Sequence, residues 1–310
     1  MRPAPLHPQV QRLFEEEFDA PPGGLAEQRA AYAPRAAKLG GTPEPVAEVL
    51  DLELPGEATL PARAYRPAEA LDADASPVIL WLHGGGWILG DLEGIDRVCR
   101  SLANASGALV VALDYRLAPE HPFPAAVRDT DAAVAWLRGD GAGALGADPA
   151  LLFVGGDSAG GNLAAVAALH ARDAVAAQLL VYPVTDGAAD TDSWTTFADI
   201  PALPATTMRA MWRRYVDEAD RLDPDASPLR ANLGGAPPAF VAVAGHDPLH
   251  DEGVAYALAL RAAGTAVTLL DYEDMPHGFL RWGGRVDRAR ELIAELGGFV
   301  RRCGGQSALR

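Results

Sequence analysis

Short apolar runs recur along the chain from residue 49 onward, and each has the length of a single strand. Some of them, such as residues 77–83 and 108–115, are too continuously apolar for a strand that is wet on one face. Strands of this kind belong in the centre of a sheet that is covered on both sides. Eight strands are predicted, at residues 49–55, 60–67, 77–83, 108–115, 151–156, 178–183, 239–245 and 266–273.

Segments with helical periodicity lie between the later strands. Helices are predicted at residues 92–105, 125–138, 159–172, 251–263 and 286–302. A strand followed by a helix, several times over, is typical of a mostly parallel sheet with right-handed crossovers. The pattern therefore predicts an α/β fold in which helices cover both faces of the sheet.

Two segments do not follow this alternation. Residues 1–45 carry amphipathic helix signals that are interrupted by APPGG and GGTPEP, and residues 185–237 form a polar, proline-punctuated insertion between two core strands. A plain loop of that length is uncommon inside a compact domain. We expect both segments to form one helical cap over the carboxyl edge of the sheet, where open α/β sheets bind their ligands. The core would then comprise residues 46–184 and 238–310.

Composition narrows the possible partners. The chain has 310 residues, 49% of them hydrophobic, and its 26 basic against 42 acidic residues give a net charge of −16. Such a charge repels phosphate backbones and anionic lipid surfaces, so no nucleic acid partner is expected. The first twenty residues lack the apolar core of a signal peptide, and no run of about 18 apolar residues occurs. We expect a soluble cytoplasmic protein without membrane insertion.

The cysteine content gives no framework for a fold. Only Cys99 and Cys303 are present, too few for a set of disulfides or for a cysteine-based zinc site. Both are interpreted as reduced thiols that pack in the interior.

Candidate chemistry begins at Gly156-Asp157-Ser158-Ala159-Gly160, where an apolar strand gives way to an alanine-rich helix. The spacing fits the G-x-S-x-G nucleophile elbow, in which small neighbours let the backbone pass closely around a strained serine. The serine would also stand at a helix N-terminus, whose free N–H groups favour developing negative charge. The competing interpretation is an ordinary turn with an N-capping serine.

A second glycine-rich loop favours the elbow. Residues 83–86 read His-Gly-Gly-Gly directly after a predicted strand, which matches the loop that supplies oxyanion-hole amides in lipases and esterases. Consecutive glycines let backbone N–H groups face a site without side chains in the way. A purely structural glycine turn is the alternative, but the order of the two motifs favours the functional interpretation.

A serine nucleophile needs a base, and the base needs an orienting carboxylate, in the chain order Ser, Asp or Glu, His. Asp247 comes just after the predicted strand 239–245, and His277 comes just after the predicted strand 266–273. Asp251 is the reserve acid, although it is expected to begin a helix that points away. His250 lies too close to Asp247 in sequence to act as the base. The structural alternative for His277 is a surface histidine in a loop.

Together these motifs resemble the bacterial hormone-sensitive-lipase-like esterases, a branch of the α/β-hydrolases, over nearly the whole chain. The resemblance rests on HGGGWILGD, DYRLAPEHPFPAA, GGDSAGGNLA, DPLHDEG and HGF. It implies the α/β-hydrolase fold, with Ser158 as nucleophile, Asp247 as acid and His277 as base. It further implies that His83 holds the glycine loop in place, and that the oxyanion amides come from Gly85, Gly86 and Ala159.

The same resemblance implies a serine carboxylesterase that hydrolyses short- to medium-chain esters through an acyl-enzyme, without a cofactor, and that could form a homodimer. An amide, a lactone or an acetylated small molecule could be turned over by the same chemistry. A non-enzymatic small-molecule receptor on this scaffold is the hypothesis from another class. The presence of serine, acid and histidine argues against it.

Five aromatic side chains are candidates for an acyl pocket. For each of them, packing between cap and core is the competing interpretation. Trp87, Trp212 and Phe279 are the predicted substrate contacts, and the remaining two are Trp194 and Phe197.

Two rival motifs point to other chemistry. GAGALG at residues 141–146 fits the dinucleotide pattern G-x-G-x-x-G, but it follows a helix and precedes a strand, which is the wrong order. It is therefore predicted to be a surface loop. His246 and His250 have the spacing of a zinc-binding helix. Pro248 should take the first helical position with Asp247 as cap, leaving His246 on the strand side, so no metal is expected.

Overall fold

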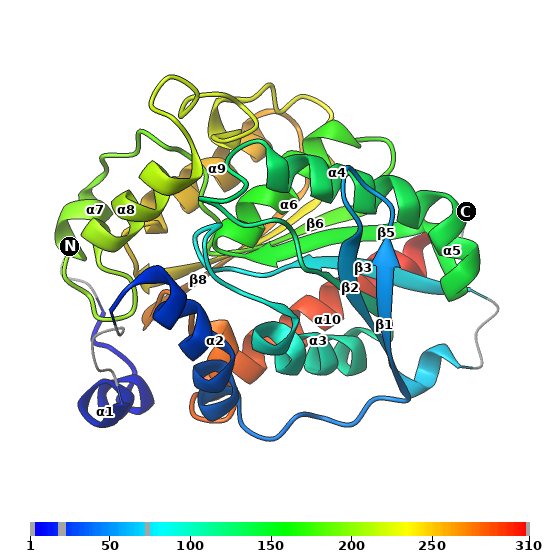
Figure 1. Ribbon diagram of the computed structural model, residues 1–310, viewed down its shortest axis with the longest axis horizontal. Coiled ribbons are helices and arrows are strands. Elements are labelled where there is room, and N and C mark those ends of the chain that lie inside the picture. The colour runs from blue at the N-terminus through cyan, green and yellow to red at the C-terminus, as the bar shows by residue number, and fades with distance from the viewer. Residues whose placement is uncertain (1–3, 18–22, 72–74, 308–310) are drawn as a thin grey trace.

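An eight-stranded sheet runs through the centre of the protein in the order β1-β2-β4-β3-β5-β6-β7-β8 (Figure 1). The computed structural model describes residues 4–17, 23–71 and 75–307. Strands β3 to β8 are parallel, and β2 runs antiparallel to both β1 and β4. The strands are β1 (Glu48–Leu54), β2 (Leu60–Arg66), β3 (Ser76–Leu82), β4 (Leu109–Leu113), β5 (Ala147–Asp157), β6 (Ala177–Val181), β7 (Ala239–His246) and β8 (Val267–Pro276). All eight predicted strands are present, so the predicted α/β fold is confirmed.

The apolar character of the central strands follows from burial on both faces of the sheet. In β3, Val78, Leu80 and Leu82 enter one hydrophobic cluster, whereas Ile79 and Trp81 enter the other. Successive side chains of a strand point to opposite faces, so a strand covered on both sides must be apolar throughout. The sheet therefore separates two hydrophobic cores.

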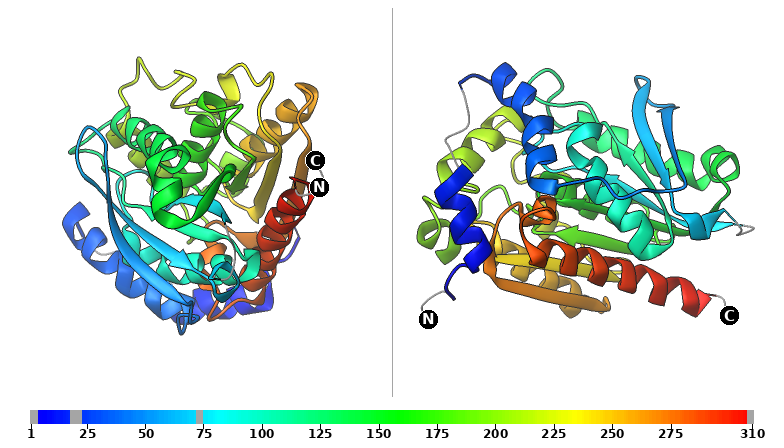
Figure 2. Two further views of the ribbon diagram at one scale, coloured as in Figure 1. Left: turned by 90° about the vertical axis from the view of Figure 1, so that its right-hand side faces the viewer. Right: turned by 90° about the horizontal axis from the view of Figure 1, so that it is seen from below.

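Helices complete the two outer layers (Figure 2). Residues of α4, α6 and α9 belong to the first cluster, and residues of α3 and α10 belong to the second. The five helices predicted from periodicity are α3 (Leu92–Ser106), α4 (Ala125–Arg138), α6 (Ala159–His170), α9 (His250–Ala262) and α10 (Asp287–Ser307).

Residues 141–145, predicted to be a surface loop, are instead helical. They lie in α5 (Asp140–Leu145), which ends at Gly146 with φ 60°. Gly141 is buried, and a Cβ there would lie 2.4 Å from the Trp136 ring. The close packing of this glycine against α4 explains a motif that has the composition of a loop but the structure of a helix.

Helices from the two segments that do not follow the strand–helix alternation lie at one end of the molecule, on the left of Figure 1. They are α1 (Pro8–Glu17), α2 (Leu25–Gly40), α7 (Asp192–Thr196) and α8 (Ala205–Tyr215). The interruption predicted at residues 20–24 lies mostly outside the described residues. Short 3-10 turns complete the chain as η1 (Ala68–Ala70), η2 (Pro228–Arg230) and η3 (Phe279–Trp282).

Strand order also determines where a ligand can enter. The chain goes from β3 to β4 on one side of β3, and then returns to place β5 on the other side. At such a reversal the loops that leave two neighbouring strands separate and open a crevice at the carboxyl ends. The His-Gly-Gly-Gly loop leaves β3 at this point, and the Ser158 turn leaves β5 beside it.

In the described part of the chain, none of the helices combines the length and the apolar character that a membrane crossing requires.

Candidate active site

Ser158 stands at the sharp turn between β5 and α6 with φ 58° and ψ −119°, a conformation that non-glycine residues rarely adopt. The flanking glycines explain how the chain can turn here. A Cβ on Gly156 would lie 2.4 Å from the carbonyl carbon of Gly160, and one on Gly160 would lie 1.9 Å from the Leu82 oxygen. The G-x-S-x-G spacing is therefore a packing requirement of the turn.

His277 lies between Ser158 and Asp247. Its Nε2 is 2.8 Å from the Ser158 Oγ, and its Nδ1 is 2.6 Å from the Asp247 Oδ2. The exposed fractions of Ser158, His277 and Asp247 are 4%, 5% and 0%. With Nδ1–H donating to the carboxylate, Nε2 is free to accept the proton of the serine hydroxyl. The three residues singled out from chain order thus meet in one buried row.

Asp247 is held by more than the histidine. Its Oδ1 accepts a hydrogen bond from the Leu249 N–H at 2.9 Å, so the carboxylate orientation is determined by the turn after β7. Asp251, the reserve acid, does not reach His277. It belongs to α9, and its Oδ2 accepts from the Ser193 N–H at 3.0 Å.

The glycine loop after β3 folds against the serine turn. Gly84 donates its N–H to Asp157 Oδ1 at 3.0 Å, and a Cβ at Gly84 would lie 3.1 Å from the Ser158 Cβ. Gly85 and Gly86 have φ values of 136° and 61°, which residues with a Cβ rarely adopt. Ala159 begins α6, and the first amides of a helix have no intrahelical acceptor.

His83 supports this loop from beneath. It is buried, its ring stacks on Tyr115 with centroids 4.4 Å apart, and the Tyr115 hydroxyl donates to the His83 carbonyl at 2.7 Å. Its Nδ1 lies 3.1 Å from the Gly84 carbonyl. Burial lowers the pKa of this imidazole, so it is neutral near pH 7 and acts as a packed scaffold.

The predicted aromatic contacts are tightly packed. Trp87 is fully buried, stacks on Tyr215 with centroids 4.1 Å apart, and meets Trp212 at 4.7 Å. Phe279 is also fully buried and packs against Tyr182 in the second hydrophobic cluster. Contact of Trp87, Trp212 or Phe279 with substrate stays a prediction.

The remaining two aromatic candidates attach the insertion to the core. Trp194 donates its indole N–H to Glu252 at 3.1 Å, and the Phe197 ring lies 5.2 Å from that of His246. Burial raises the pKa of the Glu252 carboxyl to about 8.

The sequence pattern did not single out Met211 of α8. Its sulfur lies 2.2 Å from the position that a Cβ on Gly86 would take. The insertion therefore reaches the glycine loop directly.

The zinc-like histidine pair does not converge. His246 Nε2 faces the Ala4 carbonyl at 2.7 Å, while His250 lies between Asp251 and Asp271. Helix α9 begins at His250 rather than at Pro248 as predicted, because Asp247 accepts from the Leu249 N–H in a separate turn. Within the described ranges, no group of three or more histidine, cysteine or acidic side chains is placed to hold a metal ion.

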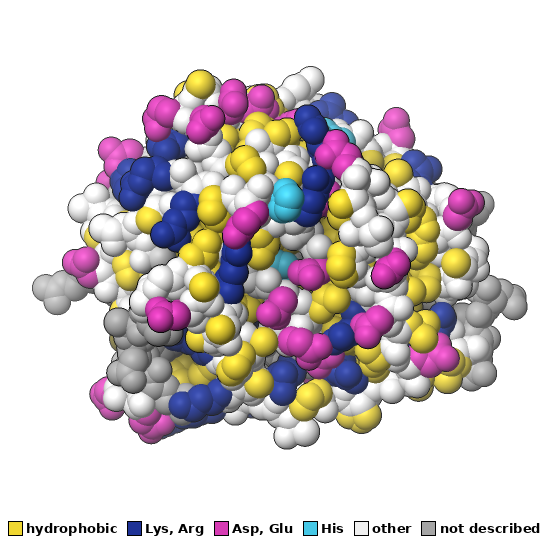
Figure 3. Space-filling view, viewed as in Figure 1, with side chains coloured by type: hydrophobic (Ala, Val, Ile, Leu, Met, Phe, Trp, Pro, Cys, Tyr) yellow, Lys and Arg dark blue, Asp and Glu magenta, His cyan; other side chains and the backbone are white. Residues whose placement is uncertain are grey.

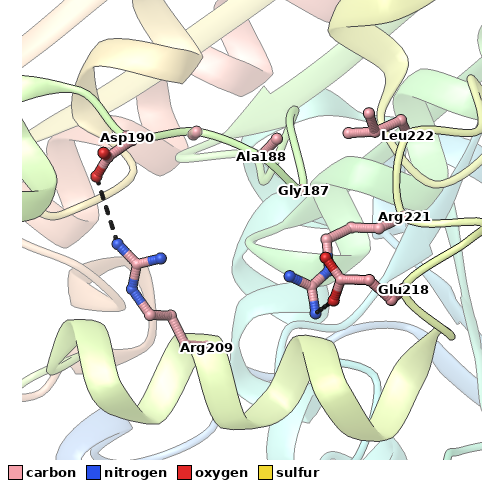
Figure 4. Close-up of a pocket in the computed structure, with 8 residues that line it drawn as sticks. Gly187, Ala188, Asp190, Arg209, Glu218, Arg221 and Leu222 are labelled. Atoms are coloured by element: carbon pink, nitrogen blue, oxygen red, sulfur yellow. Dashed lines mark ion pairs between the residues drawn. The ribbon is translucent and has the colours of Figure 1, made fainter.

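A separate cavity of about 380 Å³ lies in the insertion (Figure 4). Its charged side chains are paired with one another, Arg209 with Asp190 at 3.6 Å and Arg221 with Glu218 at 3.0 Å. Arginines and carboxylates are likewise interspersed over the face shown in Figure 3. Ser158 does not line this cavity, which is therefore separate from the serine turn.

Comparison with known proteins gives a consistent result. Residues 79–281 match a family described as having the alpha/beta hydrolase fold. The chain is 44% identical to the carboxylic ester hydrolase LipN of Mycobacterium tuberculosis over 265 residues, which cover 80% of this chain and 70% of LipN. It is 39% identical to an ethyl acetate hydrolase of Pseudomonas putida over 274 residues, 86% of each chain. Among solved structures, an esterase of Pyrobaculum calidifontis superposes with a TM-score of 0.90 at 36% identity and covers 97% of this chain and 99% of its own.

Proposed function

Because this chain belongs to the α/β hydrolase fold family and is a carboxylic ester hydrolase, we propose that Ser158, His277 and Asp247 hydrolyse the ester through a covalent acyl-enzyme. The observation that supports this proposal is the buried row of hydrogen bonds in which His277 lies 2.8 Å from Ser158 and 2.6 Å from Asp247.

In the acylation step, His277 Nε2 takes the proton of the Ser158 hydroxyl as its oxygen attacks the ester carbonyl. The carbonyl oxygen becomes a tetrahedral oxyanion. When the intermediate collapses, the bond to the alcohol oxygen breaks, and the alcohol leaves with the proton that His277 returns. The buried Asp247 carboxylate keeps the imidazole in the required tautomer and stabilises it while it is charged.

In the deacylation step, water takes the place of the alcohol. His277 removes a proton from the water as its oxygen attacks the acyl-enzyme carbonyl. Collapse of the second tetrahedral intermediate returns the proton to Ser158 and releases the carboxylic acid. Neither step requires a metal or cofactor among its reactants.

The oxyanion would be stabilised by the backbone N–H groups of Gly85, Gly86 and Ala159. The glycine loop packs on Ser158, and Ala159 contributes the first amide of α6, where unpaired N–H groups and the helix dipole both favour negative charge. Donors fixed in advance at the place where charge develops are worth several kilocalories per mole of barrier.

We further propose that residues 1–45 and 185–237 form a cap that limits the substrate to short- and medium-chain esters. The contact between Met211 and Gly86 supports this proposal, because a side chain from α8 then narrows the space next to the oxyanion loop.

Pre-steady-state hydrolysis of p-nitrophenyl acetate, butyrate, octanoate and palmitate tests the chemistry and the chain length together. We expect a burst of one p-nitrophenol per chain, turnover that is greatest for the shorter esters, and an acyl mass increment on the peptide that contains Ser158. A modified residue other than Ser158 would contradict the proposed nucleophile. Greatest turnover with palmitate would contradict the proposed cap.

The homodimer and the cytoplasmic location expected from the sequence remain predictions. Light scattering during size-exclusion chromatography and cell fractionation would test them.

A further inference from the structure

Gly84, the residue before the proposed oxyanion amides, is held through both of its backbone polar groups. Its carbonyl accepts a hydrogen bond from the Tyr32 hydroxyl at 2.8 Å, and its N–H donates to Asp157 Oδ1 at 3.0 Å. Tyr32 comes from α2, near the N-terminus, whereas Asp157 immediately precedes Ser158. Through the two peptide groups that flank its Cα, Gly84 therefore connects helix α2 to the serine turn, and the carbonyl bonded by Tyr32 belongs to the same peptide group as the Gly85 N–H.

Arg281 closes these contacts into a ring. Its guanidinium donates to the Tyr32 hydroxyl, and its Nε lies 3.6 Å from Asp157 Oδ2. Arg281 stands in η3, four residues after His277, and its side chain is 19% exposed. We call Tyr32, Gly84, Asp157 and Arg281 the Gly84 ring.

The Gly84 ring has little room to shift. A Cβ on Gly84 would lie 2.6 Å from Asp157 Oδ2, and one on Gly94 of α3 would lie 2.5 Å from the Tyr32 ring. Asp157 is fully buried, and in the described part of the protein its Oδ2 has no hydrogen-bond partner, so the Arg281 charge is its compensation. A displacement of Tyr32 or Arg281 must therefore be passed on to Gly84.

The tyrosine hydroxyl is a dependable donor. Burial raises the pKa of Tyr32 to about 12, against the opposing effect of the nearby Arg281 charge. The hydroxyl therefore keeps its proton throughout the neutral range and can donate to the Gly84 carbonyl while it accepts from Arg281.

We propose that Tyr32 and Arg281 are positioning residues, which act through Gly84 to hold the Gly85 and Gly86 amides at the distance from Ser158 that the tetrahedral oxyanion requires. This inference rests on the proposed function, because it concerns the oxyanion loop of the same site. Oxyanion donors work at about 2.7–3.1 Å from the oxygen, and a shift of about 1 Å can cost on the order of 100-fold in rate. Helix α2 would thereby contribute to transition-state stabilisation without touching the substrate.

A purely structural anchor would behave differently. It would lower the unfolding temperature and the fraction of active enzyme, but each surviving site would keep its turnover number and its affinity for an oxyanion. Burst titration of active sites separates the two cases, because it reports kcat per functional serine.

The first test compares Tyr32→Phe with Tyr256→Phe. Tyr256 is also fully buried, and its hydroxyl has no hydrogen-bond partner among the described residues, so it is the matched control. With p-nitrophenyl butyrate, we expect Tyr32→Phe to lower kcat per active site about tenfold and to change KM less than about twofold. In the adduct with butyl trifluoromethyl ketone, the Ser158 oxygen bonds to the ketone carbon, the serine proton passes to His277, and the ketone oxygen becomes an anion. This ketone should bind Tyr32→Phe more weakly by the same factor. The control should match the wild type in each of these.

The second test addresses the ring as a unit. Arg281→Lys keeps the charge but loses the planar guanidinium with its several N–H donors. Arg63→Lys is the matched control. The Arg63 side chain is similarly buried, at 17% exposure, but it pairs with Asp51 away from the serine site. We expect Arg281→Lys to lower kcat per active site about as much as Tyr32→Phe does, and Arg63→Lys to leave it unchanged. Since both residues act through Gly84, the Tyr32→Phe/Arg281→Lys double variant should lose little more than the worse single variant.

Equal kcat per active site and equal ketone affinity in Tyr32→Phe and Tyr256→Phe would overturn the proposal, and so would fully additive losses in the double variant. If Tyr32→Phe does not fold, Arg281→Lys and the ketone affinity decide alone. A wild-type protein that gives no acyl-enzyme burst would instead contradict the proposed function, so the two failures are distinguishable.

Discussion

The serine site and the insertion of residues 185–237 are held in place by different kinds of contact. Ser158, His277 and Asp247 lie at the ends of parallel strands, bond to one another, and are each at most 5% exposed. Their positions follow from the sheet. The insertion is attached to the core through side chains of α6 and α9. Two of these side chains, Glu252 and His170, are titratable.

Three anchors illustrate this attachment. Glu252 accepts from the Thr185 N–H at 2.8 Å and from the Trp194 indole at 3.1 Å. Asn162 donates to the Ala226 carbonyl at 2.9 Å. A third anchor, between His170 and Asp225, is exposed. The contrast indicates that the sheet sets the positions of Ser158, His277 and Asp247, whereas the insertion is attached to the core by separate contacts.

The sharpest test of this contrast is Ser158→Ala. We expect kcat to fall on the order of 10⁵- to 10⁶-fold, because the members of a catalytic triad act as a unit. The unfolding temperature should stay within about 2 °C, since alanine fills the same strained turn and leaves the strands unchanged. Steady-state hydrolysis of p-nitrophenyl butyrate and thermal unfolding measure the two quantities. Near-normal hydrolysis by the variant would refute the assignment of the nucleophile.

Asp247→Asn should have the next largest effect. The amide preserves the volume but no longer stabilises the imidazolium, and it can favour the wrong tautomer of His277, so kcat should fall on the order of 10⁴-fold. We expect KM to change little, because Asp247 lies behind the histidine and does not face the substrate. The matched control is Asp251→Asn, which changes a carboxylate four residues away that contacts Ser193 instead. A comparable loss of kcat in the control would make Asp251 the acid after all.

The meeting of Ser158, His277 and Asp247 could be predicted because the surrounding sequence carries clear signals. Strands buried on both faces leave continuous apolar runs, and the close packing around Gly156 and Gly160 admits only glycine. Asp247 and His277 follow from the order in which strands reach the carboxyl edge of the sheet. The neighbouring sequence thus carries the constraint for the strands and the glycines, and the order of the strands along the chain carries it for the acid and the base.

The Gly84 ring could not be predicted in this way. Tyr32, Gly84, Asp157 and Arg281 come from four distant parts of the chain, and no spacing between them marks their contact. Long-range packing of this kind leaves no periodic trace in a single sequence. Helix α5 was missed for a different reason: its glycines have the composition of a loop, although Gly141 packs against the Trp136 ring of the preceding helix.

Glu252→Ala tests the insertion side of the comparison. It leaves the buried N–H groups of Thr185 and Trp194 without their acceptor and opens a cavity, so we expect a loss of about 3 kcal/mol in the free energy of unfolding. Glu252→Gln, which keeps the volume and one acceptor, should lose about 1 kcal/mol. Urea unfolding measures both losses. The kcat per active site should fall less than about tenfold, and a collapse like that of Asp247→Asn would erase the distinction between the two regions.

The smallest expected effect concerns His170, which joins α4, α6 and the insertion. Its Nδ1 lies 3.0 Å from Asp131 and its Nε2 lies 2.8 Å from Asp225. The hydrogen bond to Asp131 and, against the cost of burial, the bond to Asp225 raise its pKa from 6.5 to about 9. The charged imidazole is thus stabilised in the folded state relative to the unfolded state.

For a group whose pKa is raised on folding, the added stability is complete below the unfolded value of 6.5, declines as the pH rises, and is lost as the pH passes the folded value of about 9. The His170 side chain is 36% exposed, so solvent screening reduces the contribution to about 1 kcal/mol. His170→Gln should therefore be about 1 kcal/mol less stable than the wild type at pH 6 and equal to it at pH 10. Urea unfolding of both proteins at the two pH values measures this difference. A gap that is the same at both would mean that His170 attaches the insertion by packing alone, and the two regions would then differ in location but not in their response to pH.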